Sequence, residues 1–318
     1  MSKRPDGAAD PLDPLSDLID TLRLSTEVQG AFELTVPFAL CARRHADIHV
    51  LLLGVVRGSV TVSTEGARPA TLTAGDVLLH TSSRPIELRD SPGTRAALTR
   101  ALKCPWLSLA TLRDDGDEAR SAFVGVGFRL ATPLKGPLLA QLPPMLVASP
   151  AASRTLDAAL TLFRAEATAI RSGGRALLRR MAEVLFIELL RQQGEAPDGA
   201  RGDLRALTDP ALARALAAIH GDPAAAWTIE SLGRVAGLSR SALAARFVAK
   251  VGETPMQYLT RSRMTRAAQL LLESEGGLNE IAARVGYRSE ASFHHAFTRF
   301  IGETPGAFRR KQRGTRAP

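Results

Sequence analysis

Hydrophobic residues along this chain follow helical spacing at both ends and a β-type pattern between them. Apolar residues at helical spacing predict a short helix over Asp13–Leu24. From Phe32 to Phe128, short runs of β-forming residues alternate with Gly, Pro and Asp turns, which is typical of an antiparallel sandwich or barrel. The clearest predicted strands are Ile48–Val56, Ser59–Ser63 and Asp76–His80.

Helical spacing returns near residue 153 and continues almost to the end of the chain. Ser153–Gln193 carries two apolar faces separated by Gly173-Gly174, which predicts a helical hairpin. Gly194–Gly202 is typical of a flexible surface linker, and an Ala/Leu-rich helical region begins at Asp209. The predicted fold class is α+β with two domains, an N-terminal antiparallel β-barrel with a helical hairpin and a C-terminal all-α domain. The expected boundaries are a disordered N-terminus (1–14), an N-terminal domain (15–193, with the hairpin at 153–193), a linker (194–208), a C-terminal domain (209–312) and a disordered tail (313–318).

A repeat of about fifty residues dominates the predicted C-terminal domain. The segment Leu232–Phe247 recurs as Ile281–Phe297, and each copy runs into Gly-Glu-Thr-Pro, at Gly252–Pro255 and Gly302–Pro305. The second turn has one extra residue, so matching positions are 49 apart before it and 50 apart after it. A small helix, a Gly turn and a second helix ending in Phe is the pattern of a helix-turn-helix. Two copies predict two recognition helices at fixed spacing.

Local residue choices support this interpretation. In the first copy Gly237 makes the turn, Ser239 is a good N-cap, and Leu243 and Phe247 hold the second helix to the core. The matching residues in the second copy are Gly286, Ser289, Phe293 and Phe297. Between the copies, Pro255–Ser274 predicts one connecting helix whose apolar stripe is interrupted by Arg263, for which the sequence names no partner.

Positive charge coincides with the repeat. The chain has 41 Lys+Arg and 32 Asp+Glu, a net charge of +9. Residues 1–200 hold 23 basic and 22 acidic residues (+1), whereas residues 201–318 hold 18 and 10 (+8). This distribution is expected if the C-terminal segment binds a polyanion such as DNA.

The motifs of this region resemble the double helix-turn-helix domain of the AraC family of transcriptional regulators. The resemblance covers Leu212–Arg310 and includes AGLSRSALAARF, QYLTRSRMTRAAQLL and VGYRSEASFHHAF followed by GETP. It implies a sequence-specific DNA-binding regulator whose main partner is double-stranded DNA. Contact with RNA polymerase is expected if the chain is an activator, but activation and repression both stay open.

The helical wheel predicts which side chains face DNA. With Leu243 and Phe247 inward, Ser241, Ala244 and Ala245 point outward, and the resemblance places base contacts at these same positions. In the second copy the outward residues are Ala291, His294, His295 and Thr298. The first face lacks long hydrogen-bonding side chains, so we expect it to use thymine methyls, water or DNA shape. The family often carries Arg near position 295, so His295 is a departure that leaves its role open.

Six basic residues are predicted to contact phosphates, which position a protein on DNA without reading its sequence. They are Arg240, Arg246, Lys250, Arg299, Arg309 and Arg310. Any of them can equally be a solvated surface charge. Two recognition helices ~34 Å apart would reach successive major grooves on one face of the DNA.

The N-terminal region resembles the cupin-type sensor domain of many AraC-type regulators. The resemblance covers Asp13–Gln193 and rests on Gly58-Ser-Val-Thr-Val and on Ala70–His80, in which Gly75-Asp76 forms a tight turn. It implies a domain that binds a small-molecule effector or holds two chains together. The helical hairpin is a candidate homodimer surface, but its apolar faces can equally pack on the barrel. The sequence identifies no ligand-contact residue.

Metal, cofactor and catalytic sites are not expected. Enzymatic cupins use two closely spaced His, a Glu and a later His, whereas His45 and His49 have three residues between them and His80 stands alone. The sequence contains no nucleophile elbow, phosphate loop or paired-carboxylate motif. Two alternatives remain, a metal-dependent cupin enzyme with an accessory DNA-binding domain and a nonspecific architectural DNA binder.

Cysteine content and hydropathy indicate a reducing, cytoplasmic location without membrane contact. The two cysteines, Cys41 and Cys104, form neither a disulfide framework nor a CxxC cluster. The N-terminus lacks the apolar core of a signal peptide, and no apolar run reaches the ~18–20 residues that span a bilayer.

Overall fold

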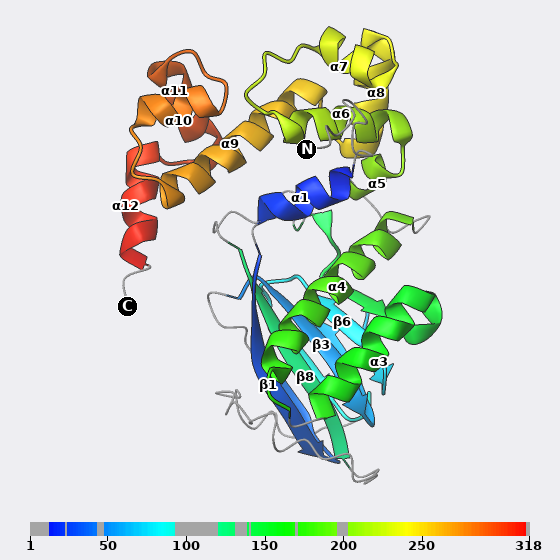
Figure 1. Cartoon of the computed structure of the whole chain (residues 1–318). Coiled ribbons are helices and arrows are strands. Elements are labelled where there is room, and N and C mark those ends of the chain that lie inside the picture. The colour runs from blue at the N-terminus through cyan, green and yellow to red at the C-terminus, as the bar shows by residue number, and fades with distance from the viewer. Residues whose placement is uncertain are drawn as a thin grey trace, which may run out of the picture. The chain divides into compact units, whose positions relative to one another are not determined.

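Two compact domains make up the chain, in agreement with the predicted α+β class. The structure, a computed structural model, describes residues 13–22, 24–42, 48–92, 120–130, 139, 141–168, 171–195 and 203–315. The N-terminal domain contains all the described strands and a pair of long helices, and the described residues of the C-terminal domain form helices joined by short loops (Figure 1).

The described strands of the N-terminal domain form two antiparallel sheets. The five-stranded sheet has the order β1 (Ser25–Thr35), β8 (Arg120–Arg129), β3 (Val50–Arg57), β6 (Val77–His80) and β9 (Met145–Ala148). The four-stranded sheet has the order β2 (Ala39–Ala42), β7 (Ile86–Arg89), β4 (Ser59–Thr64) and β5 (Ala70–Thr73).

A hydrophobic core lies between the two sheets. It joins Leu53 and Leu78 of the larger sheet to Val60, Leu72 and others of the smaller one. Among the described strands, the pairing gives two antiparallel sheets, consistent with the predicted sandwich or barrel, and these strands form a sandwich and not a closed barrel. The three strands predicted in most detail are confirmed as β3, β4 and β6.

The predicted helical hairpin is confirmed and covers the five-stranded sheet (Figure 1). After the short η2 turn (Pro150–Ala152), α3 (Arg154–Thr168) and α4 (Gly174–Glu195) are separated near Gly173, which has a φ of 85°. Phe163 of α3 lies so close to β3 that a Cβ at Gly54 would be 2.8 Å from its ring. On α4, the ring of Phe186 lies 5.2 Å from that of Phe128.

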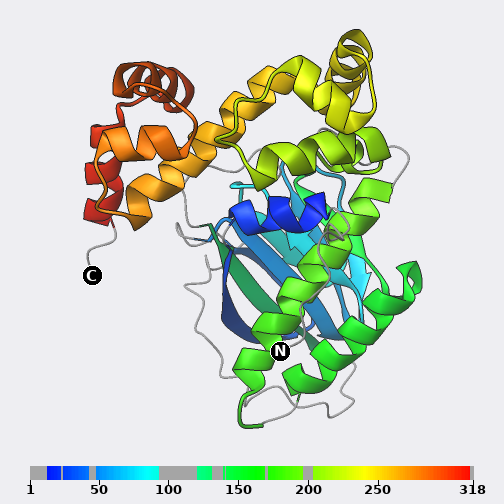
Figure 2. The ribbon, with the colours of Figure 1, turned by 45° about the horizontal axis from the view of Figure 1, so that its top comes forward.

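The C-terminal domain consists of two helix-turn-helix units that share one long helix (Figure 2). The helices are α5 (Asp203–Leu207), α6 (Pro210–Gly221), α7 (Ile229–Ala236), α8 (Arg240–Val251), α9 (Pro255–Glu273), α10 (Leu278–Arg284), α11 (Glu290–Ile301) and α12 (Pro305–Thr315). One hydrophobic core surrounds the first helix-turn-helix (α7 and α8) and another surrounds the second (α10 and α11). Helix α9, the predicted connecting helix, contributes to both cores.

Three boundaries differ from the predicted ones. Helix α4 continues to Glu195 and α5 lies inside the expected linker, while residues 196–202 lie outside the described ones. Helix α12 continues to Thr315, beyond the expected start of the tail. Helix α1 (Pro14–Leu22) contacts α5 and α6 and groups with the C-terminal domain, whereas the predicted boundary placed it with the sheets.

Candidate nucleic-acid interface

Both recognition helices begin and end with the residues that the repeat predicts. The hydroxyl of Ser239 accepts a hydrogen bond from Ala242 N at 3.2 Å at the start of α8, and Ser289 does the same for Ser292 N at the start of α11. Gly252 and Gly302 end the two helices with φ angles of 90° and 86°. These conformations are left-handed and favour glycine, so each recognition helix has a defined length.

One face of each recognition helix is fixed in a core and the opposite face is open. Leu243 and Phe247 of α8 are fully buried, as are the matching Phe293 and Phe297 of α11. The predicted outward residues Ser241, Ala245, Ala291, His294 and His295 are exposed, whereas Ala244 is half-buried.

Thr298 differs from the other predicted base-facing residues. Its side chain is half-buried, and its hydroxyl is buried without a hydrogen-bond partner among the described residues. His294 and His295 are therefore the exposed polar side chains among the predicted base-facing residues of α11.

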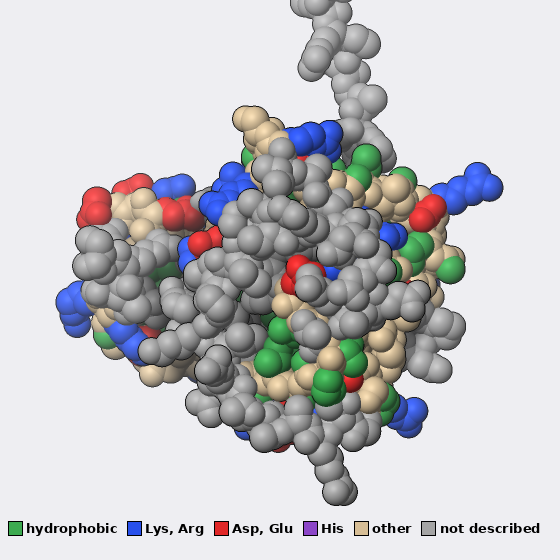
Figure 3. All heavy atoms as spheres, turned by 90° about the horizontal axis from the view of Figure 1, so that it is seen from below, with side chains coloured by type: hydrophobic (Ala, Val, Ile, Leu, Met, Phe, Trp, Pro, Cys, Tyr) green, Lys and Arg blue, Asp and Glu red, His purple; other side chains and the backbone are tan. Residues whose placement is uncertain are grey.

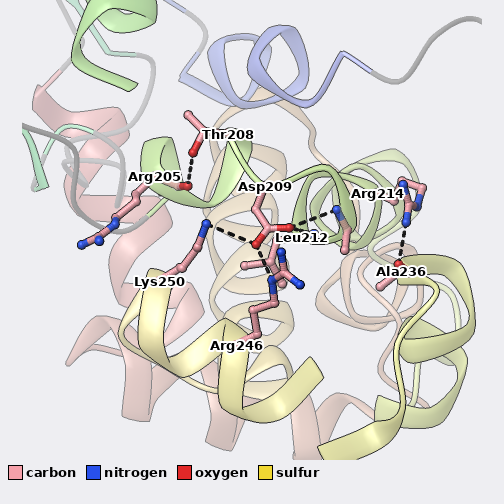
Figure 4. A network of polar contacts seen from close by, with 9 residues as sticks. Arg205, Thr208, Asp209, Leu212, Arg214, Ala236, Arg246 and Lys250 are labelled. Atoms are coloured by element: carbon pink, nitrogen blue, oxygen red, sulfur yellow. Dashed lines mark hydrogen bonds and ion pairs between the residues drawn. The ribbon is translucent and has the colours of Figure 1, made fainter. Parts of the chain in front are cut away.

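The predicted phosphate-binding residues of the first copy all form ion pairs within the domain. Arg240 lies 3.0 Å from Glu230 on the domain surface. Nε of Arg246 lies 2.5 Å from Oδ2 of Asp209, and Nζ of Lys250 lies 3.2 Å from the same oxygen (Figure 4). Asp209 therefore ties the back of α8 to the start of α6.

Asp209 has no exposed side-chain surface, so its charge must be balanced within the protein. Its other oxygen accepts hydrogen bonds from Ala211 N at 3.2 Å and Leu212 N at 3.5 Å, which caps α6. Burial raises the pKa of this carboxyl, but hydrogen bonds from Arg246, Lys250 and the Leu212 amide outweigh burial and hold the pKa below its ordinary value. The carboxylate is therefore stable as an anion inside the domain.

In the second copy, Arg309 forms a hydrogen bond within the domain, whereas the other two predicted phosphate-binding residues are exposed. Nη2 of Arg309 donates to Gly276 O at 2.7 Å and so holds α12 to the loop before α10. Arg299 and Arg310 are exposed and form no ion pair within the described part of the chain. Arg288 is also exposed, two residues before the start of α11, and sequence reasoning missed it. The extra residue of the second turn falls at this point and could have drawn attention to it.

Arg214 on α6 supports the turn of the first helix-turn-helix. Its Nε donates to Val235 O at 3.2 Å. Its Nη2 donates to Ala236 O at 2.7 Å (Figure 4). These carbonyls lie at the end of α7, where a helix leaves carbonyl groups without partners. A positive side chain there also interacts favourably with the helix dipole.

A buried aromatic group lies below the first helix-turn-helix. Nε2 of His220 and the hydroxyl of Tyr258 are 2.8 Å apart, and the Arg261 guanidinium lies 4.4 Å from the centre of the Tyr258 ring. Burial and the nearby charge of Arg261 lower the pKa of His220 from 6.5 to about 4. His220 is therefore neutral near pH 7 and acts as a structural hydrogen-bonding group.

In the N-terminal domain, two of the three histidines that the sequence analysis compared with a cupin metal site make polar contacts within the β-sandwich. Nδ1 of His49 accepts a hydrogen bond from Leu130 N at 3.1 Å, and Nε2 of the buried His80 lies 3.4 Å from the hydroxyl of Thr64. His45 lies outside the described residues. Within the described ranges, no group of three or more His, Cys, Asp or Glu could hold a metal ion.

Among the described residues, no helix could span a membrane, because none is both long enough and apolar enough to cross a bilayer. On the face drawn in Figure 3, the described Lys and Arg side chains form no continuous patch. They are scattered around the margin of that face, and hydrophobic side chains gather near its lower middle.

Comparison with known proteins agrees with this two-domain arrangement. The cupin family matches residues 13–195, and a helix-turn-helix domain family matches residues 232–311. A Streptomyces lividans protein described as an AraC-like transcription regulator is 33% identical over 303 residues, which cover 94% of this chain and 98% of that protein. The HTH-type transcriptional regulator AlkR of Acinetobacter baylyi is 29% identical over 320 residues, covering 94% of this chain and all of AlkR.

Among solved structures, the DNA-binding domain of AdpA in complex with a target DNA matches 34% of this chain and 96% of its own length. The sequences are 30% identical and the TM-score is 0.32. The duplicated helix-turn-helix, the cupin sandwich and the full-length similarity lead to one conclusion. The chain belongs to the family of AraC-like transcription regulators, with an N-terminal cupin domain and a C-terminal helix-turn-helix domain that binds DNA.

Proposed function

We propose that α8 and α11 read two blocks of bases in successive major grooves of double-stranded DNA. The supporting observation is that both helices have the same caps, the same buried face and the same open face within one helical domain. The proposed base-facing residues are Ser241, Ala244, Ala245, Ala291, His294, His295 and Thr298. A recognition helix fits the major groove, where each base pair presents a distinct pattern of donors and acceptors.

The two helices would read their blocks by different means. The α8 face has one hydroxyl and two methyl side chains, so it suits thymine methyls, bridging water or DNA shape. The α11 face adds two imidazoles, which can donate or accept hydrogen bonds at base edges. We therefore expect stronger hydrogen-bond discrimination in the block that α11 contacts.

The phosphate contacts would be made chiefly by Arg299 and Arg310, together with Arg288, which precedes α11. These side chains are exposed, whereas Arg246, Lys250 and Arg309 each hold a neighbouring element in place. Arg240 is exposed and shares its charge with Glu230, so a phosphate could replace this weak surface pair.

For the N-terminal domain we propose sensing or oligomerisation without catalysis. A small-molecule effector would bind there and alter how the DNA-binding domain is presented, with RNA polymerase as a partner if the chain activates transcription. A homodimer through the hairpin is supported by Leu162, Leu177 and Val184, which are exposed apolar residues of α3 and α4. Metal analysis of protein purified without chelator tests this role, because a stoichiometric metal would favour an enzyme.

Selection of genomic fragments by the purified full chain at physiological salt tests the DNA-reading proposal. We expect one recurring motif with two blocks about one helical turn apart. Affinity for that motif and for a shuffled duplex is then compared across salt concentrations. If no motif is enriched and binding vanishes as salt rises, the chain is a nonspecific DNA binder and the two-block proposal is wrong.

A further inference from the structure

Arg263 lies on α9 where one hydrophobic core ends and the other begins. Tyr258 and Leu259 belong to the core of the first helix-turn-helix, and Met264 belongs to the core of the second. Helix α9 joins these two cores covalently. A second attachment between the two cores would restrain their relative orientation further than this helix does alone.

The guanidinium of Arg263 holds the loop that joins α6 to α7. Its Nε donates to Pro223 O at 2.7 Å, and its Nη2 donates to Ala225 O at 2.8 Å. The same guanidinium lies 5.8 Å from the ring centre of Tyr287 in the second turn. Arg263 therefore contacts structure from both helix-turn-helix units.

The loop it holds is itself rigidly attached to the first core. Oδ1 of Asp222 accepts hydrogen bonds from Ala224 N and Ala225 N, both at 3.1 Å. Nε1 of Trp227 donates to Asp222 O at 2.8 Å, and the Trp227 ring packs against the first core. A displacement of this loop would therefore be transmitted to the first helix-turn-helix.

The backbone of the second turn lies directly against this loop. A Cβ added at Gly286 would lie 2.6 Å from Ala224 O and 2.9 Å from Ala224 Cα. At Gly237, the matching position of the first turn, the nearest atom would be Nη2 of Arg214 at 3.4 Å. The close approach is thus a property of the second turn, and it forms a contact between the two units in addition to α9.

We propose that a brace made of Asp222–Trp227, Arg263 and Gly286 fixes the distance and angle between α8 and α11. It thereby selects the spacing between the two DNA blocks that the chain binds. Changing that spacing by one base pair moves the second block by ~3.4 Å and rotates it by ~34°. A rigid reader cannot follow this change, whereas a reader without the brace has one restraint fewer between its two units and follows the change more readily. The selection of spacing rests on the proposed two-block reading of DNA.

The first test measures affinity of the full chain for the selected site with its blocks moved one or two base pairs closer or farther apart. Wild-type affinity should fall ~10-fold for one base pair, and that of Arg263→Ala by ~3-fold or less. Arg263→Lys, which keeps the charge but cannot fork between two carbonyls, should fall between them. Arg214→Ala, the matched position of the first unit, should retain the wild-type spacing profile. An unchanged profile in Arg263→Ala would overturn the proposal.

A second test needs no DNA. Spin labels are placed at the exposed positions Ala249 and Arg299 in full-length protein carrying Cys41→Ser and Cys104→Ser. Electron–electron distance measurements should give a distribution about twofold broader for Arg263→Ala than for the parent or Arg214→Ala. An equally narrow distribution would refute the brace. If the distribution broadens but wild-type binding ignores block spacing, the brace stands and two-block reading fails.

Discussion

The two helix-turn-helix units share one sequence pattern, but each fixes its recognition helix in a different way. In the first unit, Arg246 and Lys250 on the back of α8 are held by the buried carboxylate of Asp209. The matching residues of α11 are Ala296 and the exposed Phe300, and the position 49 residues after Asp209 is Tyr258 inside α9. The first recognition helix is therefore fixed by ion pairs in addition to apolar packing, and the second mainly by apolar packing.

A duplicated arginine shows the same divergence. Arg214 and Arg263 are 49 residues apart, the offset of the repeat, and each lies near the turn glycine of its own unit. Arg214 bonds carbonyls of its own turn, whereas Arg263 bonds carbonyls of the preceding unit. Because a second unit has a neighbour on its N-terminal side, the same side chain there can join two units.

The largest expected difference between the two units is the loss of stability when the turn glycine of each unit is replaced by alanine. Gly286→Ala should lower the free energy of unfolding by about 4 kcal/mol, because it combines a positive φ with overlap against the Ala224 backbone. Gly237→Ala should cost only about 1–2 kcal/mol, since its φ of 71° is strained but the nearest side chain can move. Denaturant unfolding followed by circular dichroism measures both. Equal losses would contradict the described backbone contact.

Removal of the carboxylate at Asp209 tests the ion-paired anchor. Asp209→Ala should lower the stability of the first unit by about 3 kcal/mol, because two cations lose their partner and α6 loses its cap. Fluorescence of Trp227 in a Trp106→Phe background reports this unit. Asp209→Asn keeps the cap and should lose less. A loss below about 1 kcal/mol in Asp209→Ala would show that the anchor contributes little.

His220 makes the first unit sensitive to mild acid. Its folded pKa of about 4 lies below the ordinary value of 6.5, so only the unfolded state binds a proton between these values. Titration of His220 therefore costs no stability above pH 6.5, and the free energy of unfolding should fall by about 2 kcal/mol on acidification to about pH 5. His220→Gln removes the titration and should flatten this part of the stability profile. The same slope in both proteins would exclude His220 as its source.

The recognition faces should differ in the discrimination they supply. Combined replacement of His294 and His295 by Ala should lower affinity for the selected site by about 1.4 kcal/mol, roughly tenfold. Ser241→Ala on α8 should change it only about twofold, because that face relies on methyl contacts and DNA shape. Titration of labelled duplexes measures both. A larger effect at Ser241 would reverse the proposed division between the helices.

The salt dependence of DNA affinity should distinguish arginines that contact phosphates from arginines that hold the domain together. This is the smallest of the expected effects. Arg299→Gln should reduce the slope of log affinity against log salt by about 1, because one phosphate contact is lost. Arg309→Gln should leave that slope unchanged and lower thermal stability instead, since Arg309 bonds Gly276 O. A reduced slope in Arg309→Gln would assign it to DNA.

The sequence by itself determined the elements and the orientation of the recognition helices. Gly237, Ser239, Gly252 and their repeats specify turns and helix ends by local backbone preferences, which act within a few residues. The buried spacing of Leu243 and Phe247 likewise fixes which face is outward, because a helix repeats every 3.6 residues. The two-domain class and the helical hairpin follow from the same local periodicity.

Only the tertiary structure decided which charges remain available and how the units are joined. The partners of Arg246 and Arg263 lie 37 and about 40 residues away in the sequence, so no local rule identifies them. The sandwich likewise depends on pairing between distant strands such as β1 and β8, which strand periodicity does not specify. Local preferences fix dihedral angles, whereas these contacts depend on how separate helices and strands pack in space.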